Sequence, residues 1–137
     1  MSVQIQDARH FTVDLAASYD AVFDYLSDSS KVPEWVVDFI TASRVIDGVV
    51  LVTTPMGEVP LEIEGDRSTG VIAMTFGGGD PTLSLLRRTA EGSAYDFLLA
   101  QPPGMPDAAW TGQGIPGMVH ELEVLAGIVA ERFAAAA

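Results

Sequence analysis

The chain has 137 residues, of which 19 are acidic and 7 are basic, so its formal net charge is −12. An apolar content of 48% with only 19% charged residues excludes an intrinsically disordered chain. The acidity argues against nucleic acids and anionic membranes as partners, because phosphate groups are bound by clustered Lys and Arg. The absence of cysteine excludes disulfides, thiolate catalysis and cysteine-based metal centres.

Length and patterning predict one soluble domain over residues 1–137, with residues 1–9 as a flexible or edge segment. No apolar run approaches the roughly 18 residues that a membrane span needs, so we expect no membrane insertion. The first ten residues lack the basic region and apolar core of a signal peptide. A cytoplasmic location is therefore expected.

The N-terminal part predicts a strand followed by two short helices. Phe11–Leu15 alternates apolar and polar residues, which is typical of a strand with one buried face. Ser18 is a candidate N-cap for a helix over Tyr19–Leu26, where apolar residues recur at helical spacing. A second short helix is predicted over Pro33–Phe39, because proline is favoured in a first helical turn.

The middle of the chain predicts short antiparallel strands, because its turn signals leave no room for crossover helices. The predicted strands are Arg44–Asp47, Val49–Thr54, Val59–Glu64, Val71–Phe76, Leu83–Arg88 and Tyr95–Ala100. Pro60 suggests that its strand is an edge strand or contains a bulge. The alternation of Leu61 and Ile63 with Glu62 and Glu64 predicts a sheet with one buried face and one acidic, solvated face.

The C-terminal part predicts a long helix over Pro116–Phe133, preceded by an irregular segment at residues 107–114 that places Trp110 in an exposed loop. The apolar arc of this helix consists of Met118, Leu122, Leu125, Val129 and Phe133. A one-sided sheet needs a covering layer, and only this helix is long enough to supply it. The predicted fold class is therefore α+β.

The order of elements and several local motifs resemble the START/polyketide cyclase (SRPBCC) superfamily. Phe11–Asp28 (FTVDLAASYDAVFDYLSD) resembles the opening strand, turn and first helix of that family, and Pro33-Glu34-Trp35 resembles its second helix. Gly57 with the strand after it, and Glu121–Leu125 (ELEVL), follow in the same order. The resemblance extends from about Phe11 to Phe133.

This resemblance implies a helix-grip (Bet v 1-like) fold, in which a curved antiparallel sheet of about six or seven strands surrounds a long C-terminal helix. It also implies an apolar cavity between sheet and helix. Members of the superfamily bind lipids, sterols or polyketides, and some are cyclases, dehydratases or hydrolases. Because fold does not determine function, the site has to be argued from its residues.

Few residues are candidates for catalysis. Tyr95 could offer a hydroxyl, and Arg87, which shares a strand face with two leucines, could reach a ligand. For Arg87, an ion pair with Glu62 or Asp96 across the sheet is the favoured interpretation. His10 and His120, the only histidines, are interpreted as incidental, so neither a metal nor another cofactor is predicted.

Aromatic and sulfur-containing side chains are the candidate ligand contacts, because they suit an adaptable apolar pocket. The candidates are Trp35, Phe39, Met56, Met74, Phe76, Tyr95, Phe97, Met105, Trp110, Met118 and Leu122. We therefore expect a protein that binds a small hydrophobic, lipid-like or polyketide-like molecule. A cyclase or dehydratase acting by orientation and a protein-interaction module are the alternatives, and homodimerisation stays open.

Overall fold

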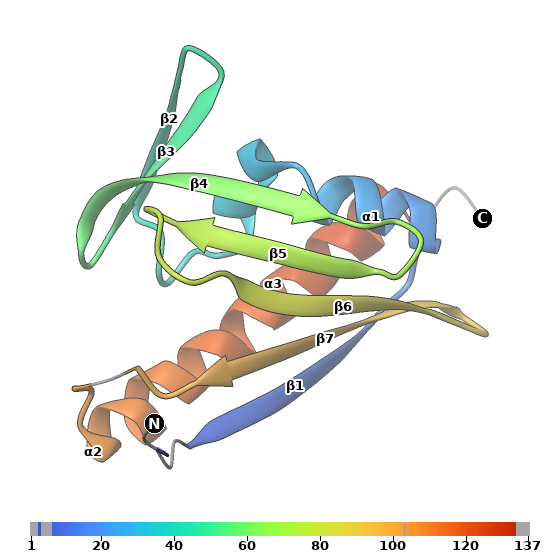
Figure 1. Cartoon of the computed structure of the whole chain (residues 1–137). Coiled ribbons are helices and arrows are strands. Elements are labelled where there is room, and N and C mark those ends of the chain that lie inside the picture. The colour runs from blue at the N-terminus through green and yellow to red at the C-terminus, as the bar shows by residue number, and fades with distance from the viewer. Residues whose placement is uncertain (1–2, 4–6, 103, 134–137) are drawn as a thin grey trace.

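The computed structural model describes residue 3, residues 7–102 and residues 104–133. Its centre is a seven-stranded antiparallel sheet with the strand order β1-β7-β6-β5-β4-β3-β2 (Figure 1). The strands are β1 (Ala8–Leu15), β2 (Ala42–Ile46), β3 (Val49–Thr54), β4 (Gly57–Gly65), β5 (Val71–Phe76), β6 (Thr82–Thr89) and β7 (Gly92–Ala100). The long helix α3 (Ile115–Arg132) lies across one face of this sheet. The predicted α+β, helix-grip-like architecture is confirmed.

Two short helices follow β1, as predicted, but the second begins earlier than expected. Helix α1 (Tyr19–Leu26) is capped by Ser18, whose hydroxyl accepts a hydrogen bond from the Ala21 N–H at 3.3 Å. The 3-10 helix η1 (Ser29–Glu34) replaces the predicted helix over Pro33–Phe39. The carboxylate of Asp28 caps it by accepting from the Ser30 N–H, and this local bond sets the earlier start.

The C-terminal helical segment also begins earlier than predicted. The short helix α2 (Asp107–Ala109) continues through the π-helical turn η2 (Trp110–Gly114) into α3. The predicted irregular segment at residues 107–114 is therefore wrong. Glycines weaken an α-helix, and Pro116, which has no N–H to donate, is tolerated because it lies in the first turn of α3.

The faces of the strands follow the predicted alternation. On β4, Leu61 is buried while Glu62 and Glu64 are exposed. The outer face is less acidic than predicted, because Leu83 and Leu98 also lie on it, with 55% and 57% of their surface exposed. The outer face is therefore a mixture of acidic and apolar side chains.

Pro60 does not mark an edge, because β4 lies between β3 and β5. Its carbonyl accepts a hydrogen bond from the Gly77 N–H at 2.8 Å, just beyond the last β4–β5 pair, Leu61 with Phe76. The N and C=O of a strand residue point to the same side, so the missing N–H of Pro60 faces the end of that ladder. A proline is tolerated there without an edge strand.

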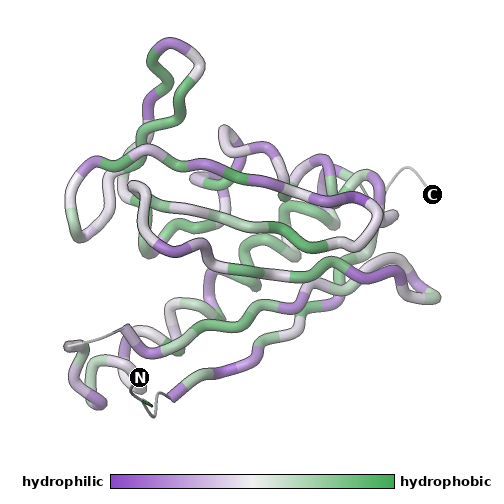
Figure 2. Tube along the Cα trace, in the orientation of Figure 1, coloured by the Kyte–Doolittle hydropathy of each residue, from purple (hydrophilic) through white to green (hydrophobic). Residues whose placement is uncertain are grey.

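The hydrophobic core lies between the sheet and the helices, and Figure 2 shows hydrophobic residues along the central strands and α3. From α3, Met118, Leu122, Leu125 and Val129 are buried. Among the described residues, every helix is too short or too polar to cross a bilayer. Part of the predicted segment 1–9 lies outside the described residues, and Ala8 and Arg9 belong to β1, an edge strand.

Candidate ligand-binding site

A cavity of about 600 Å³ lies between the sheet and the beginning of the C-terminal helical segment. One wall is the loop after η1, a second is formed by strands, and a third by η2 and α3. Its described lining residues are Trp35, Val36, Asp38, Phe39, Met56, Met74, Phe76, Gly79, Asp80, Thr82, Phe97, Leu99, Pro102, Met105, Trp110, Gln113, Gly114, Gly117, Met118 and Glu121. The wall is thus mainly aromatic, aliphatic and sulfur-containing.

Most of the residues proposed from the sequence as ligand contacts are in this wall. They are Trp35, Phe39, Met56, Met74, Phe76, Phe97, Met105, Trp110 and Met118. Tyr95 and Leu122 are buried in the core but are absent from the lining residues. Contact of any of these side chains with a ligand stays a prediction.

Four aromatic side chains of the wall, those of Trp35, Phe39, Phe76 and Phe97, make edge-to-face ring contacts. The rings of Phe39 and Phe76 are in contact, with their centroids 5.2 Å apart and their planes at 78°. Trp35 packs in the same manner on Tyr95, at 6.1 Å and 86°. Such contacts add roughly 0.5–1.5 kcal/mol beyond burial and restrict ring movement. These contacts therefore fix the orientations of the rings in the cavity wall.

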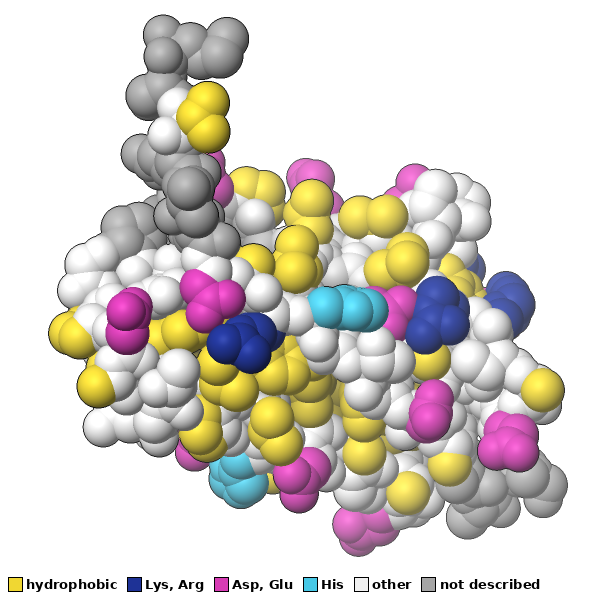
Figure 3. All heavy atoms as spheres, turned by 90° about the horizontal axis from the view of Figure 1, so that it is seen from below, with side chains coloured by type: hydrophobic (Ala, Val, Ile, Leu, Met, Phe, Trp, Pro, Cys, Tyr) yellow, Lys and Arg dark blue, Asp and Glu magenta, His cyan; other side chains and the backbone are white. Residues whose placement is uncertain are grey.

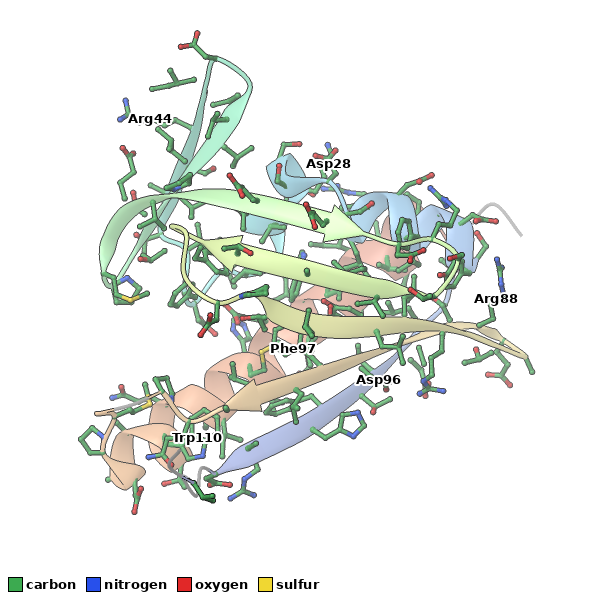
Figure 4. The ribbon with its side chains drawn as sticks, viewed as in Figure 1. Asp28, Arg44, Arg88, Asp96, Phe97 and Trp110 are labelled. Carbon is green, nitrogen blue, oxygen red and sulfur yellow. The ribbon has the colours of Figure 1, made fainter. Side chains whose placement is uncertain are left out.

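Trp110 is in the wall and not in an exposed loop, which corrects the sequence-based expectation. Only 1% of its surface is exposed, and its Nε1–H donates to the Asp7 carboxylate at 2.9 Å. Figure 4 shows Trp110 at the start of the C-terminal helical segment and Phe97 on β7, on two elements that face each other. Burial of this large ring stabilises the helical turn that its local sequence disfavours.

Glu121 is the polar side chain that the sequence analysis missed. It is 6% exposed, and its Oε2 accepts the backbone N–H groups of Asp38 and Phe39 at 3.0 and 3.1 Å. Burial raises the pKa of this carboxyl, although the two backbone hydrogen bonds oppose that shift. Its position in the sequence is a signal of burial, because Glu121 is three residues after Met118 and four before Leu125, at the border of the apolar arc of the helix.

His120 lies beside the cavity on the exposed side of α3. Its Nδ1 is 2.8 Å from the Asp38 carboxylate, which raises the pKa of the imidazole. His10 belongs to β1 and His120 to α3, and the histidine side chains in Figure 3 lie apart from each other. No group of three His, Cys, Asp or Glu side chains that could hold a metal ion occurs among the described residues.

The polar groups of the wall have one sign of charge. Asp38, Asp80 and Glu121 contribute carboxyl groups, while Lys, Arg and His are absent from the described lining residues. The indole N–H of Trp35 is buried and has no hydrogen-bond partner within the described part of the chain. The cavity therefore combines an apolar body with an acidic region.

Neither candidate for catalysis reaches the cavity. Arg87 lies on the outer face of the sheet and pairs with the carboxylate of Asp96, with one contact of 3.1 Å, which is the interpretation favoured from the sequence, and it is absent from the lining residues of the cavity. Tyr95 is fully buried, and its hydroxyl donates to the Ser84 hydroxyl at 2.8 Å. Its hydroxyl is therefore engaged within the core.

A second depression, of about 450 Å³, lies between α1 and β6. Figure 4 shows Arg88 at this end of the sheet, away from the cavity. The three arginines that line this depression already have partners: Arg67 pairs with Asp20 and Asp24, Arg87 pairs with Asp96, and Arg88 lies 4.1 Å from the ring centroid of Tyr19. We therefore assign the ligand site to the larger cavity.

No model of a known protein family matches the chain, and neither does any curated protein. Solved structures do match. The KanY protein has a TM-score of 0.67 at 14% identity, with 92% of this chain and 99% of that chain covered. A Bacillus halodurans protein has a TM-score of 0.65 at 15% identity, with the same coverage of both chains. The Aha1 dimer from Colwellia psychrerythraea has a TM-score of 0.61 at 9% identity, with 90% and 96% covered. At these identities the likeness shows the fold alone.

Proposed function

We propose that the chain binds a small hydrophobic molecule in the cavity between the sheet and the C-terminal helical segment, as a protein of the SRPBCC type. The observation that carries this proposal is the cavity itself, about 600 Å³ with a wall rich in aromatic and methionine side chains. Small-molecule sites typically measure about 300–1,000 Å³ and have few polar groups in an apolar wall. Methionine side chains adapt to ligand shape, and ring faces stack on flat molecules.

The proposed ligand is a lipid-like or polyketide-like molecule, and binding rather than catalysis is the proposed role. The cyclase alternative depended on Tyr95 and Arg87, and neither lines the cavity. The helix-grip-like fold shared with the solved structures supports the proposal only as a scaffold that can enclose such a cavity.

The proposal can be tested with a substitution in α3 that places a larger side chain in the cavity. Gly117 is a lining residue in α3, and a Cβ added there would meet only Asp38, at ordinary contact distances of 3.8 and 3.9 Å. Gly117→Leu therefore places a side chain at the cavity without a steric clash in the backbone. Gly127→Leu is the matched control, because Gly127 is also in α3, has nothing within 4 Å of such a Cβ, and does not line the cavity.

We expect the wild type to bind N-phenylnaphthylamine, a neutral dye whose fluorescence rises in apolar surroundings, at one saturable site. Gly117→Leu should weaken binding about tenfold or more, which corresponds to about 1.4 kcal/mol, and Gly127→Leu should bind as the wild type does. Both variants should be at least as thermally stable as the wild type, since glycine disfavours a helix. Equal binding by the two variants, or no saturable binding by the wild type, would contradict the proposal.

A further inference from the structure

We propose that the ligand has an apolar body and a cationic amine end, and that the carboxylate of Glu121 binds this end. The inference rests on the proposed function and adds the chemical class of the ligand. It also predicts that carboxylic acids with the same apolar body are poor ligands. The argument uses the free oxygen of Glu121, the charges of the wall and the positions of the basic residues.

The geometry of Glu121 leaves one oxygen available to the cavity. Oε2 accepts the N–H groups of Asp38 and Phe39, and Oε1 has no hydrogen-bond partner in the described part of the chain. Only 6% of the surface of Glu121 is exposed, yet this residue lines the cavity. Two backbone hydrogen bonds hold the carboxylate in a fixed orientation, so its second oxygen is presented to a ligand without a large entropic cost.

The charges around the cavity favour a cation. The wall contains three carboxyl groups, those of Asp38, Asp80 and Glu121, and the described lining residues include no basic side chain. His120 contacts Asp38 from the exposed side of α3, and it is not in the wall. In an environment of low dielectric constant an uncompensated carboxylate attracts an ammonium group and repels a second carboxylate more strongly than in water.

The arginine side chains are engaged elsewhere in the molecule, and Lys31 is absent from the described wall of the cavity. Arg44, Arg87 and Arg132 pair with Glu58, Asp96 and Glu34, outside the cavity. Arg9 pairs with Asp7, Arg67 with two aspartates of α1, and Arg88 stacks on a tyrosine ring. In the described wall Glu121 thus has no protein cation to neutralise it, and an ammonium group of the ligand would supply that charge.

A purely structural role for Glu121, as an anchor for the loop after η1, is the alternative. Glu121→Gln separates the two roles, because an amide oxygen can still accept the backbone N–H groups of Asp38 and Phe39 while the negative charge is removed. Glu123→Gln is the matched control. Glu123 is two residues further along the same helix, is exposed and does not line the cavity.

The test compares three ligands that share one apolar body: naphthylmethylamine, naphthalenemethanol and naphthoic acid. Each displaces N-phenylnaphthylamine from the full chain at neutral pH, and calorimetry gives the affinity independently. We expect the wild type to bind the amine about tenfold or more tightly than the acid, because hydrogen bonds to charged groups are the strong ones. Glu121→Gln should reduce this ratio about tenfold, with the alcohol nearly unaffected, and Glu123→Gln should keep the wild-type ratio.

The outcomes distinguish this inference from the proposed function. A wild type that binds the dye but does not prefer the amine to the acid overturns the inference and leaves the proposed function intact. This wild-type ratio also decides the matter if Glu121→Gln does not fold. An unchanged ratio in folded Glu121→Gln overturns the role of Glu121, and the absence of saturable binding by any probe overturns both proposals.

Discussion

Glu121 combines two features that are usually separate, a core position on a helix and a charge. Its neighbours on the apolar arc, Met118, Leu122 and Leu125, pack against the sheet. A buried carboxyl is costly unless it is hydrogen-bonded, and the N–H groups of Asp38 and Phe39 meet that need for one oxygen. Burial still disfavours the charged form of the carboxyl, and this raises the pKa of Glu121.

The raised pKa of Glu121 predicts that the free energy of unfolding depends on pH. The folded state holds the Glu121 proton more tightly than the unfolded chain does, so protonation stabilises the fold below the unfolded-state pKa, and this contribution disappears as the pH rises through the folded-state pKa. Glutamine cannot titrate. The free energy of unfolding of Glu121→Gln minus that of the wild type should therefore increase from acidic to neutral pH. Urea denaturation at a series of pH values measures this, and a difference that shrinks with rising pH would contradict burial as the main cause.

Arg87 illustrates how a single residue is ambiguous until its strand is paired. Leu83, Leu85 and Arg87 share one face of β6, and Ser84 and Leu86 share the other. Both faces have apolar residues, so the local pattern does not say which face is inside. The register with β7, where Leu86 pairs with the buried Tyr95, assigns Leu86 to the core and Arg87 to the outer face.

At the scale of elements, the β2–β3 hairpin projects beyond the rest of the sheet (Figure 1). Its turn is Asp47-Gly48, with φ values of 52° and 79°. Positive φ at both central residues is the geometry of the hairpin turn that matches strand twist, and it favours Asn or Asp followed by Gly. Strand β3, which follows this turn, contributes Val50 and Val52 to the core, so the turn supports buried residues.

Gly48→Ala should destabilise the hairpin by about 1 kcal/mol, because an L-residue pays that cost in the left-handed region. A Cβ at this position has nothing within 4 Å, so the effect is conformational and not steric. Gly127→Ala is the opposite control: it lies in the exposed face of α3 and should stabilise by about 1 kcal/mol. Chemical denaturation and hydrogen exchange of the β2 and β3 amides measure both. Unchanged exchange in Gly48→Ala would contradict the role of the turn.

The beginning of the C-terminal helical segment is a second feature at the scale of elements. The segment from α2 into α3 is helical where glycines and Pro116 predict an irregular chain. Its stability comes from contacts made at a distance in the sequence, namely the burial of Trp110 and its bond to Asp7. Tertiary packing overrides propensity here, and it places Trp110 in the cavity wall.

For the whole molecule, the net charge of −12 is distributed over the surface while the cavity wall is mainly apolar. The ion pairs of the described residues, such as Arg44 with Glu58, are mostly exposed and contribute little each. Repulsion among the remaining acidic side chains destabilises the compact state. The acidity therefore opposes folding at low ionic strength.

Salt should accordingly stabilise the protein. Raising sodium chloride from about 0.01 M to 0.15 M shortens the screening length from about 30 Å to 8 Å. We expect Tm to rise by a few degrees, corresponding to about 1 kcal/mol. Scanning calorimetry measures this, and potassium chloride should act equally because the effect is screening. A falling Tm would show that the ion pairs lose more from screening than the acidic surface gains.

The sequence by itself determined the features that depend on near neighbours. The cap at Ser18, the strand alternation around Leu61 and the apolar arc of α3 follow from spacing, because each needs only residues a few positions away. The α+β class followed from the order of these elements. The resemblance based on local motifs supplied the expectation of a cavity.

Only the tertiary structure decided which residues meet. The direction of Arg87, the burial of Trp110 and the bond from Glu121 to the loop after η1 each join residues far apart in the chain. Their energies arise from burial and pairing after the sheet has closed over the helix, so no local pattern encodes them. The cavity is the sum of such contacts, and its acidic region could be located only once the elements were packed together.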